Sequence, residues 1–371
     1  MRRHAALALT CILWATPAIC PLAQTPATES SATPDSSPEQ VSTLSARSTL
    51  VLVPALVRNK AGELVFTLKA DDFVLTDDGI PQKLTLEEDT GGEPLALVID
   101  IEGGRSALRE LKKFIAIGPM IDSIIGKVPH RVAVVGFDSS PVLVTDFTAD
   151  TATAAQGIQD LIADNSGDDG AAILDSLGFS VDLLRRQPPQ YRRAVLLISE
   201  TNGDSSNLQI NEALREISDT NATIYSVGFS TGKSKAKEIW SGLKSPPPPS
   251  AGCDSTGGCF SLMPEVKMAM MAAIVTADGL RRNVPETVAR LTGGEYFQFG
   301  DEKSLASDLQ IISNHIPNRY VLSFQPQSPH PGFHILTLQL PDYVNLKLSA
   351  RNGYWAGASG AAASPGEAAS R

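Results

Sequence analysis

The sequence has few of the features that mark nucleic-acid-binding and membrane-surface proteins. None of its runs of lysine or arginine exceeds two residues, and the formal net charge over 371 residues is −10. A negative chain without a basic patch is repelled by nucleic acid and by anionic lipid headgroups. We therefore expect neither nucleic acid nor a membrane surface as a partner.

The first 23 residues have the composition of a secretory signal peptide. A basic start at Arg2 and Arg3 precedes an apolar stretch, and Ala23 offers a small residue for cleavage. Threonine and proline within the stretch make it a poor transmembrane anchor. We expect an exported protein, periplasmic or extracellular, without a membrane span in the mature chain. The polar, low-complexity segments 24–47 and 357–371 are expected to be disordered.

Cysteine is scarce, and only Cys253 and Cys259 lie beyond the signal segment. A glycine-rich stretch separates them, which in an exported protein predicts a local disulfide. A two-thiol metal site is the alternative, although no histidine lies nearby to complete it. The surrounding residues 243–275 interrupt the pattern of strands and helices, so we interpret them as an insertion.

Apolar runs alternate with helical patterns between residues 94 and 316. This alternation is typical of an α/β fold with a doubly wound, mostly parallel sheet. The turn at 137–141 is the exception, because it is short enough to join two antiparallel strands. The predicted strands are 95–100, 131–137, 142–146, 193–199, 222–229 and 295–299, and the predicted helices are 105–126, 151–164, 171–187, 207–219, 286–292 and 302–315.

Strand patterns without helices occupy the flanking segments 48–93 and 317–356. We predict two antiparallel hairpins in the first, with turns at 59–62 and 77–79. Each segment has about 40 residues, which is short for an independent domain. We therefore expect both to pack together as one small β-sandwich beside the α/β domain. The expected strands are 50–53, 64–68, 72–75, 82–86, 320–324, 333–340 and 346–348.

Asp100 stands at the end of the apolar run 95–99. Such a run predicts a strand that is buried on both faces, and open α/β sheets bind ligands at the carboxyl ends of their strands. Asp100 is followed by Glu102 and Gly104, so a carboxylate, a second carboxylate and a glycine are spaced two residues apart. This edge is the first candidate for a site.

The chain resembles the exported bacterial proteins with a VWFA-related domain of the Acidobacteria type, a branch of the von Willebrand factor type A superfamily. The resemblance implies a Rossmann-like domain that binds other proteins through a divalent ion, Mg²⁺ or Ca²⁺. It also implies an ion site made from an Asp-x-Ser-x-Ser segment, a threonine and a second aspartate. The segments that carry it are 75–82, 95–100, 134–138, 143–148, 172–177, 194–199, 223–228, 291–297 and 350–354.

The sequence departs from this pattern at four of the five ligand positions. Glu102 and Gly104 replace the two serines, Ala171 replaces the threonine, and Glu200 replaces the last aspartate. Gly104 and Ala171 offer no side-chain oxygen. Two added carboxylates would neutralise a divalent ion and repel the carboxylate of a partner. We therefore expect a degenerate site at Asp100, Glu102 and Glu200 that holds no ion.

Two alternatives to the degenerate site remain open. Glu102, Glu200 and Asp100, helped by Asp168 or Asp169, would bind Ca²⁺ with a changed geometry. In the other alternative Ser106 shifts into register and restores a site near the original. Without an ion, we expect Asp100 or Glu102 to be held by hydrogen bonds or by Arg105.

The function we expect is that of an exported, non-catalytic module that binds or scaffolds a protein partner without a cofactor. A metal-dependent adhesion domain with a modified Ca²⁺ or Mg²⁺ site is the first alternative, and an unrecognised hydrolase is the second. A hydrolase would be favoured by His315 or His334 bonded to a buried serine or carboxylate in a cleft. His330 and His334 are four residues apart, but Pro331 and Gly332 exclude the helical spacing of metal ligands, so we expect ordinary surface or edge residues.

Overall fold

A six-stranded sheet forms the centre of the α/β part of the chain. The computed structural model describes residues 50–87, 93–112, 125, 128–164, 166–201, 203, 205–229, 283–327 and 330–356. All neighbouring strands are parallel except β7, which runs antiparallel to β6 after the tight turn at 137–141. The mixed sheet confirms the predicted alternation. Its order is β10 (Tyr296–Gln298), β9 (Thr223–Phe229), β8 (Arg192–Glu200), β5 (Leu95–Glu102), β6 (His130–Phe137) and β7 (Pro141–Thr148).

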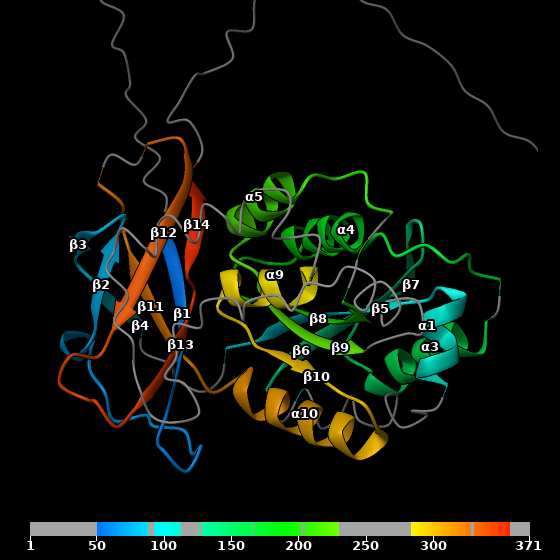
Figure 1. Ribbon diagram of the computed structural model, residues 1–371, viewed down its shortest axis with the longest axis horizontal. Helices are drawn as coiled ribbons and strands as arrows, with labels where there is room; N and C mark the ends of the chain where they lie inside the picture. The colour runs from blue at the N-terminus through cyan, green and yellow to red at the C-terminus, as the bar shows by residue number, and fades with distance from the viewer. Residues whose placement is uncertain are drawn as a thin grey trace, which may run out of the picture. The chain divides into compact units, whose positions relative to one another are not determined.

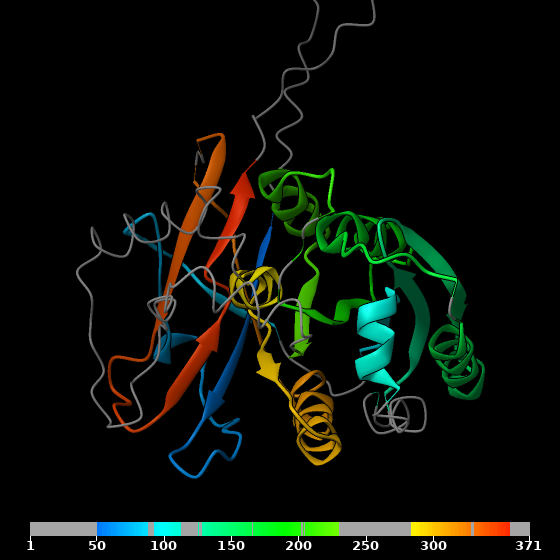
Figure 2. The same cartoon turned by 45° about the vertical axis from the view of Figure 1, so that its right-hand side comes forward.

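Helices cover both faces of this sheet (Figures 1 and 2). Every residue of β5 is buried, because Leu97 and Ile99 alternate with Ala96 and Val98 and so supply two separate hydrophobic clusters. The first cluster includes α1 (Arg105–Leu111), α3 (Thr151–Ala163) and α10 (Glu302–His315). The second includes α4 (Ile173–Arg185), α5 (Ile210–Thr220) and α9 (Val284–Thr292).

Side-chain caps explain where several helices begin and end. Asp150, Asn283 and Asp301 each accept a hydrogen bond from a backbone N–H in the first turn of α3, α9 and α10. Gly293 ends α9 in the left-handed region at φ 82°, where a residue without a Cβ is favoured. Within the described residues, no helix is long and apolar enough to cross a bilayer.

Strands from both ends of the described chain combine in two four-stranded antiparallel sheets. A single hydrophobic cluster includes residues of both, among them Val53, Leu75, Leu322 and Leu336. The first sheet has the order β13 (Lys347–Ala350), β1 (Val51–Arg58), β11 (Tyr320–Phe324) and β4 (Thr85–Glu87). The second has the order β14 (Gly353–Ala356), β12 (Gly332–Gln339), β2 (Val74–Asp77) and β3 (Ile80–Gln82).

One of the two predicted hairpins is present at the predicted turn, but its second strand is 80–82; the strand predicted at 82–86 is wrong, because residues 85–87 form β4 and pair with β11 in the other sheet. β2 pairs with β3 across a two-residue turn, in which Asp78 and Gly79 have φ of 48° and 84°. The prediction of a strand at 64–68 is wrong, because regular pairing there stops at one bridge between Arg58 and Leu64. The N–H of Leu68 donates instead to the hydroxyl of Tyr320, and the Leu68 side chain enters the core.

Several predictions fall on segments outside the described residues. These are the signal peptide, the linker at 24–47, the insertion at 243–275 with Cys253 and Cys259, and the tail at 357–371. The second half of the helix predicted at 105–126 also lies there, apart from Ile125.

Candidate functional site

Asp100 lies near the carboxyl end of β5 and is fully buried. Its Oδ1 accepts a hydrogen bond of 2.6 Å from the hydroxyl of Ser176, and its Oδ2 accepts one of 3.0 Å from Ser180. Both serines lie on α4, four residues apart and so on one face of the helix. Burial raises the pKa of Asp100 to about 7, although the two serine hydrogen bonds act in the opposite direction.

Glu102 points to the same face of the sheet as Asp100, since the two are separated by one residue of a strand. Its side chain is buried, and its Oε2 accepts a hydrogen bond of 2.7 Å from the backbone N–H of Glu200 at the end of β8. The structure therefore brings Glu102 and Glu200 together through a backbone donor. Glu102 joins the ends of two neighbouring parallel strands.

The loop that follows Asp168 fills the space beside Gly104. A Cβ on Gly104 would lie 3.0 Å from the carbonyl oxygen of Gly170, so a serine there would crowd the loop. Ser106 does not take over the missing position, because its hydroxyl donates to Asp169 Oδ1 at 3.1 Å. Asp168 accepts hydrogen bonds from the N–H groups of Gly170 and Ser139, which lower its pKa.

Asp100 or Glu102 was expected to be held by hydrogen bonds or by Arg105, and both are held by hydrogen bonds. The guanidinium of Arg105 donates to the carbonyl of Gly167 at 2.8 Å. The donors to Asp100, Ser176 and Ser180, were not predicted from the sequence. Their spacing was a usable signal, because two serines stood on the apolar face of a predicted helix.

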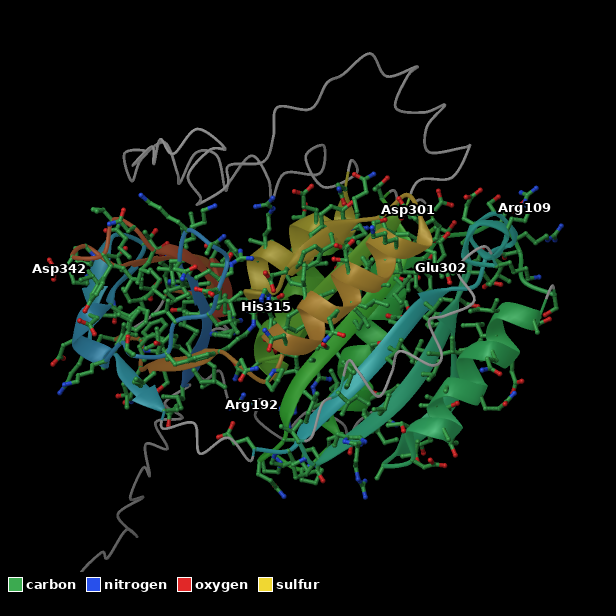
Figure 3. All side chains as sticks on the ribbon, turned by 90° about the horizontal axis from the view of Figure 1, so that it is seen from below. Arg109, Arg192, Asp301, Glu302, His315 and Asp342 are labelled. Atoms are coloured by element: carbon green, nitrogen blue, oxygen red, sulfur yellow. The ribbon has the colours of Figure 1, made fainter. Side chains whose placement is uncertain are left out.

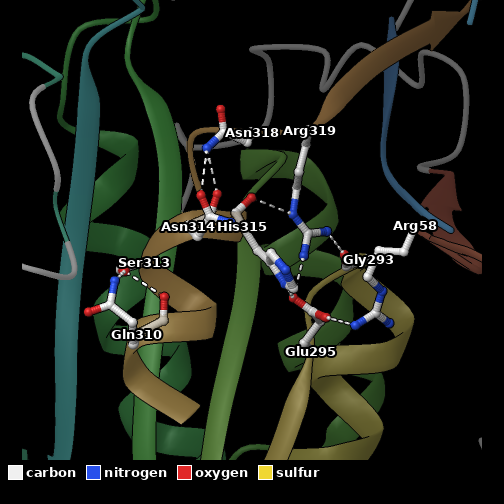
Figure 4. Close-up of polar contacts among 9 residues, drawn as sticks. All are labelled: Arg58, Gly293, Glu295, Gln310, Ser313, Asn314, His315, Asn318 and Arg319. Carbon is white, nitrogen blue, oxygen red and sulfur yellow. Dashed lines mark hydrogen bonds and ion pairs between the residues drawn. The ribbon is translucent and has the colours of Figure 1, made fainter. Parts of the chain in front are cut away.

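A buried carboxylate away from the end of β5, Glu295, lies just before β10 in an ion network (Figure 4). Its Oε2 is 2.6 Å from His315 Nδ1 and 3.2 Å from Arg319 Nη2, and its Oε1 is 3.6 Å from Arg58 Nη1. Burial by itself raises the pKa of Glu295. The hydrogen bond from His315 and the nearby positive charges outweigh burial, so the pKa lies below its ordinary value.

The network joins segments that are far apart in the sequence. Arg319 also donates to the carbonyls of Gly293 and His315, and its guanidinium carbon lies 4.9 Å from the ring centroid of Tyr225. His315 lies at the end of α10 opposite to Asp301 and Glu302 (Figure 3). All of these polar contacts are made within the protein. We therefore interpret the network as a structural link between β1, α10 and the segments before β10 and β11.

His330 lies at the surface as predicted, but the prediction of a surface or edge residue is wrong for His334, which lies on the inner strand β12. His334 is buried, and its ring stacks on that of His330 at a centroid distance of 4.1 Å. Both rings turn a nitrogen toward Asp78 at the β2–β3 turn. Among the described residues, Asp78, His330 and His334 form a group that could hold a metal ion.

A serine motif at the end of β9 was also missed. Residues 228–232 read Gly-Phe-Ser-Thr-Gly, which fits the spacing of a hydrolase nucleophile elbow. The described part of the chain includes this motif only as far as Phe229, so Ser230 lies outside it.

The chain was compared with known proteins by sequence and by structure. No protein-family model matches it, and no curated protein matches it either. Similar solved structures include BatB from Bacteroides thetaiotaomicron, at 14% identity and a TM-score of 0.38, with 60% of this chain and 98% of that chain covered. The vWF domain of the pili tip protein Mfa5 from Porphyromonas gingivalis gives 12% identity, a TM-score of 0.36 and coverage of 61% and 95%. Proximal thread matrix protein 1 from the mussel byssus gives 9% identity, a TM-score of 0.40 and coverage of 60% and 48%. The likeness is coarse and concerns the α/β fold alone.

Proposed function

We propose that the chain is an exported, non-catalytic module of the von Willebrand factor type A kind, which binds or scaffolds a protein partner. We further propose that it does so without an ion at the end of β5. The observation that carries this is the burial of Asp100 with both carboxylate oxygens bonded to Ser176 and Ser180. An ion at Asp100 would have to break two buried hydrogen bonds, and Gly104 and Ala171 would supply no side-chain oxygen in return.

Titration calorimetry of the mature protein with Mg²⁺, Mn²⁺ and Ca²⁺ tests the ion-free strand end. We expect no binding heat that depends on Asp100, because its oxygens are already bonded inside the protein. The matched control is Asp100→Asn, which keeps the side-chain shape and can still bond to both serines. Heat that the wild type shows and the variant lacks would support the carboxylate-rich Ca²⁺ or Mg²⁺ site instead.

Exposed apolar side chains lie near the carboxyl ends of the strands, on the side of the sheet's end where Asp100 is found, and they provide a place to test partner binding. Val142 is 59% exposed at the start of the edge strand β7, beside the carboxyl end of β6. We expect cross-linking in the cell envelope to capture a protein that Val142→Asp no longer captures. Ile80→Asp is the control, because Ile80 is 65% exposed but lies on β3 in another sheet. Equal capture by both variants would place the partner elsewhere.

The hydrolase alternative required His315 or His334 to bond to a buried serine or carboxylate in a cleft, and the bond to a buried carboxylate is present. His315 and His334 both contact buried carboxylates, Glu295 and Asp77. Both histidines are themselves enclosed, at 5% and 3% exposure, which leaves little surface for a substrate. Turnover of an activated ester that disappears in Ser230→Ala would nevertheless contradict the non-catalytic proposal.

A further inference from the structure

Three side chains converge at one end of the sheet formed by β14, β12, β2 and β3. The Oδ2 atom of Asp78 lies 3.2 Å from His330 Nε2 and 2.9 Å from His334 Nδ1. All three atoms lie within 4.8 Å of one another. Ligand atoms around a tetrahedral Zn²⁺ are separated by about 3.3 Å, given metal–ligand bonds of about 2.0–2.1 Å. The two distances from Asp78 Oδ2 are therefore close to the spacing that a bound ion would set.

The hydrogen bonds of His334 leave one nitrogen directed at negative charge. Its Nε2 lies 2.8 Å from the carbonyl oxygen of His330, which can only accept, so Nε2 carries the proton. The other nitrogen, Nδ1, lies 3.0 Å from Asp77 Oδ1 and 2.9 Å from Asp78 Oδ2. Two carboxylate oxygens facing one imidazole nitrogen need a proton or a cation between them.

The carboxylates of Asp77 and Asp78 each accept a further hydrogen bond through the oxygen that does not face His334. The hydroxyl of Tyr354 donates to Asp77 Oδ2 at 2.8 Å, and the N–H of Ile335 donates to Asp78 Oδ1 at 2.9 Å. Metal ligands in proteins are oriented by such outer hydrogen bonds, and a ligating histidine commonly donates its second N–H to a backbone carbonyl.

The turns that present these groups depend on residues suited to positive φ. Asp78 and Gly79 form the two-residue turn between β2 and β3. Gly332 has φ 133° and starts β12 directly after His330 and Pro331. The pairing of Leu336 with Asp77 then sets β12 beside β2, which brings His334 to Asp77 across 257 residues of sequence.

We propose that Asp78, His330 and His334 bind one divalent transition metal of the Zn²⁺ class, with the adjacent carboxylate of Asp77 as a fourth ligand. Two imidazole nitrogens favour Zn²⁺ over Mg²⁺ or Ca²⁺, which prefer ligand sets made of oxygen. Two carboxylates match the charge of a divalent ion. His330 is 64% exposed in its side chain, so this side of the ion would be open to water or to a ligand from a partner. This site is separate from the strand end at Asp100.

Calorimetric titration of metal-stripped mature protein with Zn²⁺ tests the proposal. We expect one equivalent to bind with a dissociation constant on the order of micromolar or lower, and the melting temperature to rise with Zn²⁺. His330→Ala removes an exposed ligand without opening the core, and Asp78→Asn keeps a residue that tolerates positive φ. Each variant is expected to weaken binding at least tenfold and to lose the thermal shift. Tyr354→Phe is expected to weaken binding by about tenfold through Asp77.

Two controls separate this site from other sources of binding. His130→Ala removes a histidine on β6 and should bind Zn²⁺ like the wild type. The double variant Cys253→Ser and Cys259→Ser should also bind normally, because no thiol is part of the proposed site. The proposal is overturned if the wild type binds no Zn²⁺, if His330→Ala and Asp78→Asn bind it unchanged, or if binding is lost only with the cysteines.

Discussion

Replacing Glu295 by glutamine is expected to lower the free energy of unfolding by about 3–5 kcal/mol at neutral pH, because it leaves buried positive charge without its partner. Arg319 is only 5% exposed and both it and His315 bond to Glu295 Oε2. A glutamine fills the same volume, so packing loss adds little. Urea unfolding followed by circular dichroism measures the difference.

The matched control for Glu295→Gln is Glu286→Gln on α9. Glu286 pairs with Arg290 at 2.8 Å, but the arginine side chain is 40% exposed. An ion pair open to solvent contributes less than about 1 kcal/mol. If Glu295→Gln is no more destabilising than this control, the network does not stabilise the junction of β1, α10 and β11.

The Glu295 contribution also has a predicted pH dependence. The pKa of Glu295 is lowered in the folded state, so the stability it contributes is present above the pKa of the unfolded chain. It is lost as the pH falls through the folded-state pKa, which lies below the ordinary value of 4.5. The difference between wild type and Glu295→Gln should therefore shrink below about pH 4.5.

Asp100 is expected to make the protein less stable as the pH rises from 4 to 7. Its pKa is raised from 3.8 to about 7, so the folded state holds a proton that the unfolded state has lost in this range. The contribution is fully present below pH 3.8 and disappears as the pH passes the folded-state value. At about 1.36 kcal/mol per pKa unit, the loss is on the order of 4 kcal/mol.

The variant Asp100→Asn isolates this effect. The amide stays neutral at every pH and can bond to Ser176 and Ser180, so the decline between pH 4 and pH 7 should vanish. Above pH 7 the variant should unfold at higher urea concentration than the wild type. Asp150→Asn is the control, because asparagine caps a helix as well as aspartate does and Asp150 is exposed. A decline that persists in Asp100→Asn would rule out Asp100 as its cause.

The sequence predicted the secondary structure of the central sheet closely, because that part depends on local patterns. Apolar runs mark strands that are buried on both faces, and β5 extends only two residues beyond the predicted 95–100. The strand predicted at 64–68 failed because a tertiary contact decided it. The backbone ladder stops after the N–H of Val65 donates to the carbonyl of Val57, and the N–H of Leu68 donates to the hydroxyl of Tyr320.

The candidate sites were predicted less completely than the fold. The strand end was located from Asp100, Glu102 and Glu200, but their partners lie on α4 and in a backbone group of β8. The two histidines were judged by their spacing in the sequence. Their partner Asp78 belongs to a turn more than 250 residues away, and only the pairing of β12 with β2 reveals it.

The shared sheets have a consequence for how the chain is made. β1 pairs with β11, and β2 pairs with β12. The strands that are synthesised first therefore cannot form these pairs until the last strands have been synthesised. Throughout that delay, β1 to β4 have edges without partners, and closing so long a loop is slow. Unpaired apolar strands are prone to aggregate during the wait. We therefore expect the two shared sheets to form only after the last strands have been synthesised.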